Sequence, residues 1–157
     1  MKTILVVCTG NVCRSPMVAG LLTHYIETAN LADQLVVKSA GTGASPGMGA
    51  SGHSVTVLAR KGIDISDHAA QRLSYDLIQE AALILVMEEA HRSHIFYQSP
   101  ENLDKVLLLS ELAGLQGDIA DPFGQDEAAY RRTLRLVENM LVIGWPRLLQ
   151  RLGVGDE

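Results

Sequence analysis

Short apolar runs alternate along the chain with longer segments of helical periodicity. The apolar runs predict strands at residues 4–7, 35–39, 82–87 and 105–109. The helical periodicity predicts helices at residues 16–28, 54–61, 73–80, 88–97 and 125–143. Strands that alternate with helices favour a parallel sheet with right-handed crossovers and helices on both faces. We therefore predict one α/β domain over residues 1–157, with three layers and a four-stranded, twisted parallel sheet flanked by helices.

Two segments interrupt this pattern. Residues 40–52 read AGTGASPGMGASG, and their richness in Gly, Ser and Pro predicts a loop. Loops of this length often carry function. Near the C-terminus, Gly144-Trp145-Pro146 should end or kink the last helix, because proline lacks a backbone N–H and disfavours helix at the residue before it.

Composition and charge exclude several classes of function. The 157 residues suit one globular domain, with 47% hydrophobic and 20% charged residues. The net charge of −5 argues against nucleic acid as a partner, because phosphate backbones are bound by clustered Lys and Arg. We find neither a signal peptide nor the roughly 20 apolar residues that cross a bilayer. We therefore expect a cytoplasmic protein with no membrane partner.

Residues 8–16, CTGNVCRSP, join the first predicted strand to the first predicted helix. Backbone N–H groups in such a loop point inward, and the helix start adds unpaired donors and positive dipole. Gly10 and Asn11 tolerate the left-handed conformations that an anion-binding nest requires. Ser15 can cap the helix, and Pro16 suits its first turn. The segment therefore predicts a phosphate-binding loop at the carboxyl edge of the sheet, where ligands of α/β proteins bind.

Cys8 and Arg14 supply this loop with a nucleophile and an anion-binding group. A thiol that faces a ring of N–H donors at a helix start should ionise more readily than a free cysteine. Arg14 can grip two phosphate oxygens while the thiolate attacks phosphorus in line. Ser15 can donate its hydroxyl to the thiolate and ease its later departure. The combination indicates covalent catalysis followed by hydrolysis.

Phosphoryl transfer also needs an acid, because the leaving oxygen must be protonated. The segment DIADPFG offers Asp118 and Asp121. Pro122 should hold Asp121 on a constrained turn above the loop. Phe123 beside it should shield the carboxyl from water and pack on a substrate ring. Asp121 is therefore the preferred candidate for the general acid.

The cysteine and histidine content argues against a metal site. Cys8 and Cys13 make a poor disulfide framework and are better suited to a reactive site in a reducing compartment. Zinc would need further ligands that the neighbouring sequence does not supply, so we expect no metal and no cofactor. Four histidines are expected on the surface or in helices rather than as ligands: His24, His53, His91 and His94.

CTGNVCRSP, Ser39-Ala40-Gly41 and Asp121-Pro122-Phe123 together resemble the low molecular weight protein tyrosine phosphatase family, in the same order over nearly the whole chain. The resemblance implies hydrolysis of phosphotyrosine in proteins without a metal. It implies Cys8 as the nucleophile, Arg14 as the phosphate-binding arginine and Asp121 as the general acid. The residues that it implies around the phosphate are Thr9, Gly10, Asn11, Val12, Cys13, Arg14 and Ser15.

The resemblance also implies supporting residues. Asn11 matches the asparagine that holds the strained backbone of the loop, with Ser39 and His68 as its hydrogen-bonding partners and Ser15 as a further support. Cys13 matches the second loop cysteine, which can form a reversible, protective disulfide with the nucleophile after oxidation.

Departures from the family pattern bear on the substrate. Many members have an aromatic residue soon after Ser-Ala-Gly, where this loop has Ser45. Many also have a pair of aromatic residues after the Asp-Pro, where this chain has Phe123 followed by glycine. The expected pocket is therefore lined by Val12, Ser45 and Phe123, with one aromatic wall. A bacterial branch that removes phosphate from arginine has threonine at the position of Val12. Because an apolar wall satisfies a guanidinium poorly, we favour phosphotyrosine and keep phosphoarginine as the alternative.

Two further interpretations are weaker. Arsenate reductases share the loop but relay a disulfide through additional cysteines, and no cysteine follows Cys13. A non-catalytic phosphate-binding module would need neither the nucleophile Cys8 nor the acid Asp121. The expected partners are therefore phosphorylated proteins, and the oligomeric state is left open.

Overall fold

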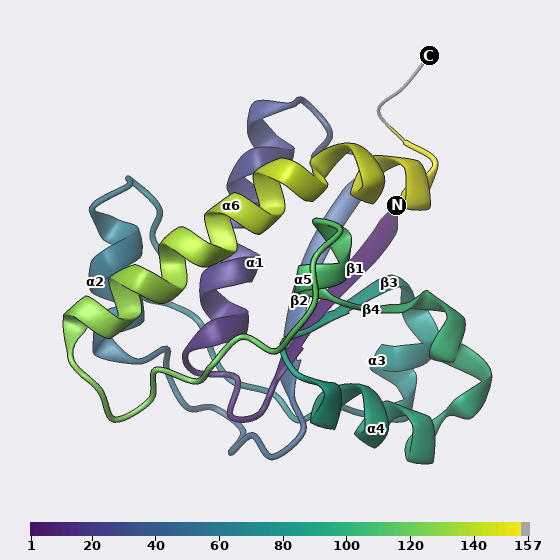
Figure 1. Ribbon diagram of the computed structural model, residues 1–157, viewed down its shortest axis with the longest axis horizontal. Helices are drawn as coiled ribbons and strands as arrows, with labels where there is room; N and C mark the ends of the chain where they lie inside the picture. The colour runs from purple at the N-terminus through teal and green to yellow at the C-terminus, as the bar shows by residue number, and fades with distance from the viewer. Residues whose placement is uncertain (155–157) are drawn as a thin grey trace.

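The computed structural model describes residues 1–154, which form a parallel sheet covered by helices (Figure 1). The strands are β1 (Lys2–Cys8), β2 (Leu35–Gly41), β3 (Ala81–Val86) and β4 (Val106–Leu108). Their order in the sheet is β2-β1-β3-β4, and all neighbours pair in parallel. The predicted α/β class and four-stranded parallel sheet are confirmed. The last three residues of the predicted 1–157 domain lie outside the described range.

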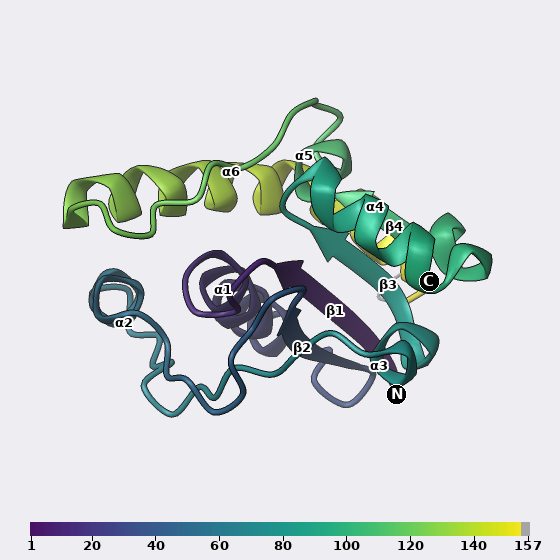
Figure 2. The same ribbon diagram turned by 90° about the horizontal axis from the view of Figure 1, so that it is seen from below.

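Helices cover both faces of this sheet (Figure 2). They are α1 (Arg14–Thr28), α2 (Gly52–Ala59), α3 (Tyr75–Glu80), α4 (Glu89–Gln98), the 3-10 helix η1 (Pro100–Lys105), α5 (Leu109–Leu112) and α6 (Glu127–Leu152). Side chains of α1, α2, α5 and α6 share one core with the sheet, and those of α3 and α4 share the other. The sheet is therefore the middle of three layers.

The central strand β1 places the candidate nucleophile. Successive side chains of a strand point to opposite faces, so Ile4, Val6 and Cys8 enter the α1–α6 core. Leu5 and Val7 enter the core beneath α3 and α4. Burial on both faces explains why this strand reads as an uninterrupted apolar run. Cys8 is its last residue and therefore lies at the carboxyl edge of the sheet.

The last helix does not end at Gly144-Trp145-Pro146, so the expectation that it stops there is wrong. Helix α6 continues to Leu152 with Pro146 inside it. Pro146 removes the hydrogen bond to the carbonyl of Val142. Val142 is 64% exposed, so water can reach this turn of the helix, while Leu148 and Leu152 beyond the proline are buried in the core. Their burial opposes the cost of an interior proline, which is about 3 kcal/mol. Within residues 1–154, no helix is long and apolar enough to span a bilayer.

Candidate active site

The loop between β1 and α1 is tied to the end of β2. Register pairing places Gly41 beside Cys8. The backbone N–H of Gly43 donates to the carbonyl of Thr9 at 2.9 Å. A Cβ on Gly41 would lie only 2.4 Å from that carbonyl oxygen, so this position requires glycine. The Ser39-Ala40-Gly41 segment therefore lets β2 approach the loop closely.

Asn11 holds the loop from inside. It is buried and has a left-handed backbone with φ of 58°. Its Nδ2 donates to the hydroxyls of Ser15 at 2.7 Å and Ser39 at 2.9 Å. Its Oδ1 accepts from the backbone N–H of Gln71 at 2.9 Å, and its carbonyl accepts from Nε2 of His68 at 2.7 Å. These bonds offset the left-handed backbone and anchor the loop to three separate segments.

Two local expectations for this loop are corrected. Gly10 does not have a positive φ, so Asn11 is the left-handed residue of the pair. Ser15 is not the helix cap, because α1 begins at Arg14 and its N-cap residue is Cys13. No side chain caps the N-terminus of α1. The Ser15 hydroxyl is therefore available to another partner, and the first turn keeps its donors free.

Two donors converge on the sulfur of Cys8. The thiol is buried, and its Sγ lies 2.9 Å from Oγ of Ser15. The backbone N–H of Asn11 donates to the same sulfur at 3.2 Å. Because Ser15 Oγ accepts from the Asn11 side chain, its own hydrogen can point at the sulfur. The sulfur of Cys8 therefore faces two hydrogen-bond donors.

The loop around this sulfur holds donors without partners. In the part of the chain that the structure describes, none of these backbone N–H groups donates a hydrogen bond: Gly10, Val12, Cys13, Arg14 and Ser15. Nε of Arg14 is also buried without a partner, and this side chain is 1% exposed. Buried donors are rarely left unsatisfied. Their convergence on one loop indicates a site built for a multiply charged oxyanion.

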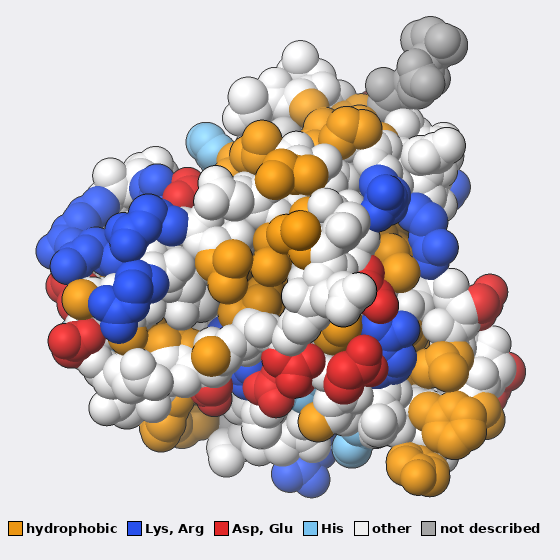
Figure 3. All heavy atoms as spheres, viewed as in Figure 1, with side chains coloured by type: hydrophobic (Ala, Val, Ile, Leu, Met, Phe, Trp, Pro, Cys, Tyr) orange, Lys and Arg blue, Asp and Glu red, His pale blue; other side chains and the backbone are white. Residues whose placement is uncertain are grey.

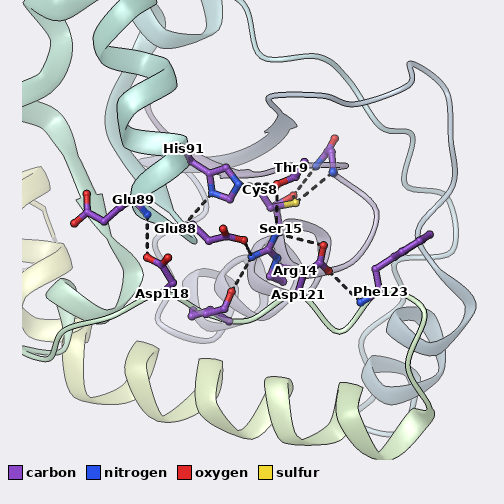
Figure 4. A network of polar contacts seen from close by, with 12 residues as sticks. Cys8, Thr9, Arg14, Ser15, Glu88, Glu89, His91, Asp118, Asp121 and Phe123 are labelled. Atoms are coloured by element: carbon purple, nitrogen blue, oxygen red, sulfur yellow. Dashed lines mark hydrogen bonds and ion pairs between the residues drawn. The ribbon is translucent and has the colours of Figure 1, made fainter.

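The guanidinium of Arg14 is held most closely at Nη1. This nitrogen forms an ion pair with Glu88 and donates to the carbonyl of Ile119 at 2.7 Å. Nη2 makes longer contacts, at 3.5 Å, to both Oγ1 of Thr9 and Oδ2 of Asp121 (Figure 4). Nε has no partner within the described residues, so the edge formed by Nε and Nη2 can turn to a bidentate contact with phosphate. Glu88 was not expected here, because the sequence does not show that α4 begins beside the loop.

His91 connects the same network to Thr9. Its Nδ1 accepts from the backbone N–H of Glu88 at 3.1 Å, so the proton of the neutral ring is on Nε2. That Nε2 lies 2.9 Å from Oγ1 of Thr9 and donates to it. Burial, followed by the nearby Arg14 cation, lowers the pKa of His91 to about 4. His91 was expected on the surface or in a helix; it lies on α4 but is 2% exposed.

The lowered pKa of His91 predicts a loss of stability in mild acid. Its ordinary pKa is near 6.5, so between pH 6.5 and 4 the unfolded chain binds a proton that the folded chain does not. The stability that the fold gains by keeping His91 neutral is complete above pH 6.5 and is lost as the pH falls towards 4. We expect this loss to lower the free energy of unfolding by up to about 3 kcal/mol. The other charged groups that act on this ring are Arg14, Glu88, Asp118 and His94.

Urea unfolding of wild type and His91→Gln from pH 7 to pH 4 measures this effect. The carboxylates titrate in both proteins, so the difference between the two curves reports His91. The wild type should lose more stability than the variant over this range. If the free energy of unfolding fell equally with pH in both proteins, folding would not lower the pKa of His91.

The two candidate acids have different surroundings. Oδ1 of Asp118 accepts from the backbone N–H of Glu89 at 2.9 Å and so caps the start of α4. Oδ1 of Asp121 accepts from the backbone N–H of Phe123 at 3.1 Å, and its other oxygen faces Arg14. Asp121 alone of the two lines the cavity above Cys8.

The expected shielding of Asp121 by Phe123 is wrong. The Phe123 side chain extends away from the carboxyl (Figure 4) and is 67% exposed. The Asp121 side chain is itself 43% exposed. Water therefore reaches the carboxyl directly.

A cavity of about 300 Å³ opens above the loop. Val12, Ser45 and Phe123, the expected pocket residues, all line it. Met48 lines it as well and is largely exposed, and the sequence pattern did not single it out for this role. The walls are mostly apolar, whereas the floor carries the sulfur and Arg14. The cavity therefore suits a phosphate group attached to an apolar body.

Cys13 differs from Cys8 in its surroundings. Its Sγ lies 3.2 Å from the hydroxyl of Tyr130, and neither cysteine is in a disulfide. Burial raises the pKa of the Cys13 thiol, and burial together with Cys13 raises the pKa of Tyr130 to about 12. The raised pKa keeps the Cys13 thiol protonated at neutral pH, so Cys8 stays the candidate nucleophile.

Comparisons with known proteins agree with this geometry. The model of the family "Low molecular weight phosphotyrosine protein phosphatase" matches residues 3–152. The chain is 40% identical over 148 residues to a probable low molecular weight protein-tyrosine-phosphatase, EpsP, of Ralstonia nicotianae, covering 94% of this chain and 97% of the relative. It is 41% identical over 139 residues to a protein-arginine-phosphatase of Geobacillus stearothermophilus, covering 88% of this chain and 90% of the relative.

A solved structure shares the fold closely. It is the arginine phosphatase YwlE in a Cys-to-Ser mutant with a phosphorylated active-site serine. Its TM-score is 0.87 at 36% identity, with 96% of this chain and 99% of that chain covered. With the matched family model, these likenesses show that the chain belongs to the low molecular weight phosphotyrosine protein phosphatase family.

Proposed function

We propose that this phosphatase hydrolyses phosphotyrosine in proteins through a phosphocysteine at Cys8. One observation carries the proposal: unpaired N–H groups, with the unpartnered Nε of Arg14, surround a sulfur that already accepts two hydrogen bonds. Such a floor binds three equatorial phosphate oxygens and leaves the axial direction to the sulfur. Asp121 lines the cavity above.

The first step transfers the phosphoryl group to sulfur. The Cys8 thiolate attacks phosphorus while the bond from phosphorus to the phenolic oxygen breaks. Asp121, protonated in this complex, gives its proton to the departing oxygen, so that tyrosine leaves as a neutral phenol. The loop N–H groups and Arg14 stabilise the charge on the equatorial oxygens throughout.

The second step hydrolyses the phosphocysteine. Asp121, now ionised, accepts a proton from water as the water oxygen attacks phosphorus. The sulfur–phosphorus bond breaks, and Cys8 leaves as a thiolate that receives the Ser15 hydrogen bond. Inorganic phosphate departs and Asp121 is again protonated. The phosphorylated active-site serine of the related YwlE mutant supports a covalent intermediate at this position.

The redox role of Cys13 and the cytoplasmic location of the protein remain predictions. Cys13 lies in the same loop as Cys8 and is reduced, which suits a protective disulfide after oxidation. A catalytic thiolate must stay reduced, which favours the cytoplasm as its compartment.

The cavity walls favour tyrosine over arginine as the phosphorylated residue. Val12, Met48 and Phe123 offer an aromatic ring apolar contacts. A phosphoguanidinium would need acceptors for its N–H groups, and an apolar Val12 supplies none. Phosphoarginine is the second candidate, because a relative of similar identity is named a protein-arginine-phosphatase.

Parallel assays on two peptides test the proposed substrate. We expect kcat/KM for a phosphotyrosine peptide to exceed that for a matched phosphoarginine peptide by about tenfold or more, the scale of one unsatisfied buried donor. Val12→Thr should narrow this ratio, because its hydroxyl can accept from a guanidinium. A higher kcat/KM for phosphoarginine in the wild type would reverse the assignment.

A further inference from the structure

A cluster of basic side chains lies beside the active site on an otherwise acidic protein. We call it the basic surface; it consists of Arg60, Lys61, Arg131, Arg132 and Arg135. The first two follow α2, and the others lie on the first half of α6. Figure 3 shows Lys and Arg side chains gathered over these two elements. The chain as a whole has a net charge of −5, so this surface has the opposite sign.

The basic surface is only partly neutralised. Arg60 and Arg131 share one carboxylate, that of Glu127. Lys61 pairs with Glu138 at 2.8 Å, and Asp126 caps α6. Five basic side chains and these three carboxylates leave two positive charges in excess.

Arg132 and Arg135 account for this excess. Both are exposed, and neither forms an ion pair with any residue in the described range 1–154. On a helix, residues three apart are neighbours, so the two guanidinium groups lie on adjoining parts of α6. They are therefore the free cations of the basic surface.

A second cavity links these cations to the active site. It has a volume of about 210 Å³ and lies between the segment 119–125 and α6. Arg132 lines it together with Pro122, Thr133 and Leu136. Asp121 lines both this cavity and the one above Cys8. A peptide that leaves the active site past Asp121 therefore enters a groove whose wall includes Arg132.

The opposite side of the active site carries carboxylates. Glu88, Glu89 and Asp118 lie there, at the start of α4 (Figure 4), where Glu88 pairs with Arg14 and Glu89 with Arg92. The surroundings of a bound peptide are therefore asymmetric, with carboxylates near α4 and, on α6, the two arginines of the basic surface that are unpaired within residues 1–154. Such asymmetry orients a charged chain and speeds its association.

We propose that the basic surface binds acidic side chains flanking the phosphorylated residue of the protein substrate. Arg132 contacts the residue nearest the active site, and Arg135 contacts one farther along α6. The inference rests on the proposed function and defines its substrates further, as phosphotyrosine sites with Asp or Glu on one side. The contacts are exposed ion pairs, so they should act chiefly on KM and weaken with salt.

Three phosphotyrosine peptides of equal length test this inference. One has Glu before the phosphotyrosine, one has Glu after it, and one has Gln at all these positions. At low salt we expect one of the acidic peptides to have a kcat/KM about fivefold above that of the Gln peptide, the scale of two exposed ion pairs. Most of this preference should disappear in 0.5 M NaCl. Equal values for all three peptides would overturn the proposal.

Variants locate the effect. The double variant Arg132→Gln/Arg135→Gln should lose the preference, and Arg132→Lys/Arg135→Lys should keep most of it. Arg151→Gln, an exposed change at the far end of the same helix, should keep it fully. Turnover of p-nitrophenyl phosphate should be unchanged in all of them. A Gln double variant that kept the preference would overturn the proposal, whereas hydrolysis of p-nitrophenyl phosphate but of no peptide would overturn the proposed function itself.

Discussion

Replacement of Cys8 by serine should reduce turnover of phosphotyrosine peptides and of p-nitrophenyl phosphate by about 10⁴-fold or more. A serine hydroxyl is a far weaker nucleophile than a thiolate and a poorer leaving group in the second step. Acid quench of the wild type during turnover should trap phosphate on Cys8, as detected by mass spectrometry of the peptide that contains it. The Cys8→Ser variant should yield no phosphocysteine.

Phosphate binding is the control for this variant, because Cys8→Ser should still bind inorganic phosphate. The loop N–H groups and Arg14 remain in place, so inorganic phosphate should raise the melting temperature of wild type and variant alike. Near-wild-type turnover in Cys8→Ser would remove Cys8 from the mechanism. Failure to trap any phosphocysteine in the active wild type would favour direct attack by water.

Replacement of Asp121 by alanine should slow release of tyrosine in a single turnover by about 10²- to 10⁴-fold. Tyrosine has a pKa of about 10 and leaves poorly as an anion. p-Nitrophenol is more acidic and leaves readily without a proton. Its release in a single turnover should therefore slow much less. Rapid-quench assays with both substrates give the two ratios.

Asp121→Asn is the matched control, since it keeps the size of the side chain and removes the proton. It should behave like Asp121→Ala in both assays. Inhibition by inorganic phosphate should be little changed, because the loop holds the phosphate. Equal slowing of both leaving groups would show that Asp121 acts elsewhere in the reaction, and wild-type rates would exclude it altogether.

The chemistry at the loop could be predicted because its residues are contiguous. CTGNVCRSP contains the proposed nucleophile, the arginine and the serine within nine residues. Residue type made both Gly10 and Asn11 candidates for a left-handed backbone, and only Asn11 has one. Asp121 lines the cavity above the loop, as expected from its place before Pro122, and its role as the acid stays a prediction. The sheet could also be predicted from the strand pattern, because β1 and β3 are buried on both faces and so form continuous apolar runs in the sequence.

The rest of the site could not be predicted from the sequence, because it depends on the order of the strands in the sheet. Glu88 and His91 reach Arg14 and Thr9 because β3 lies next to β1, which places the start of α4 beside the loop. Nothing local to residues 88–91 reveals that neighbour, although their three-residue spacing is that of a helix cap. Helix α5 and η1 were missed because they are too short for periodicity. The end of α6 was misjudged because packing beyond Pro146 outweighs local preference.

The residues that anchor Asn11 are different from the residues that line the cavity. The support of the loop and the shape of the cavity can therefore change independently in evolution. Ser39, His68 and Gln71 support the loop, and none of them lines the cavity. Ser45, Met48 and Phe123 line the cavity and come from segments outside the loop. Mutations in those outer walls can therefore reshape the cavity while the hydrogen bonds that hold the loop stay intact. One inherited scaffold can thus serve relatives named for tyrosine and for arginine.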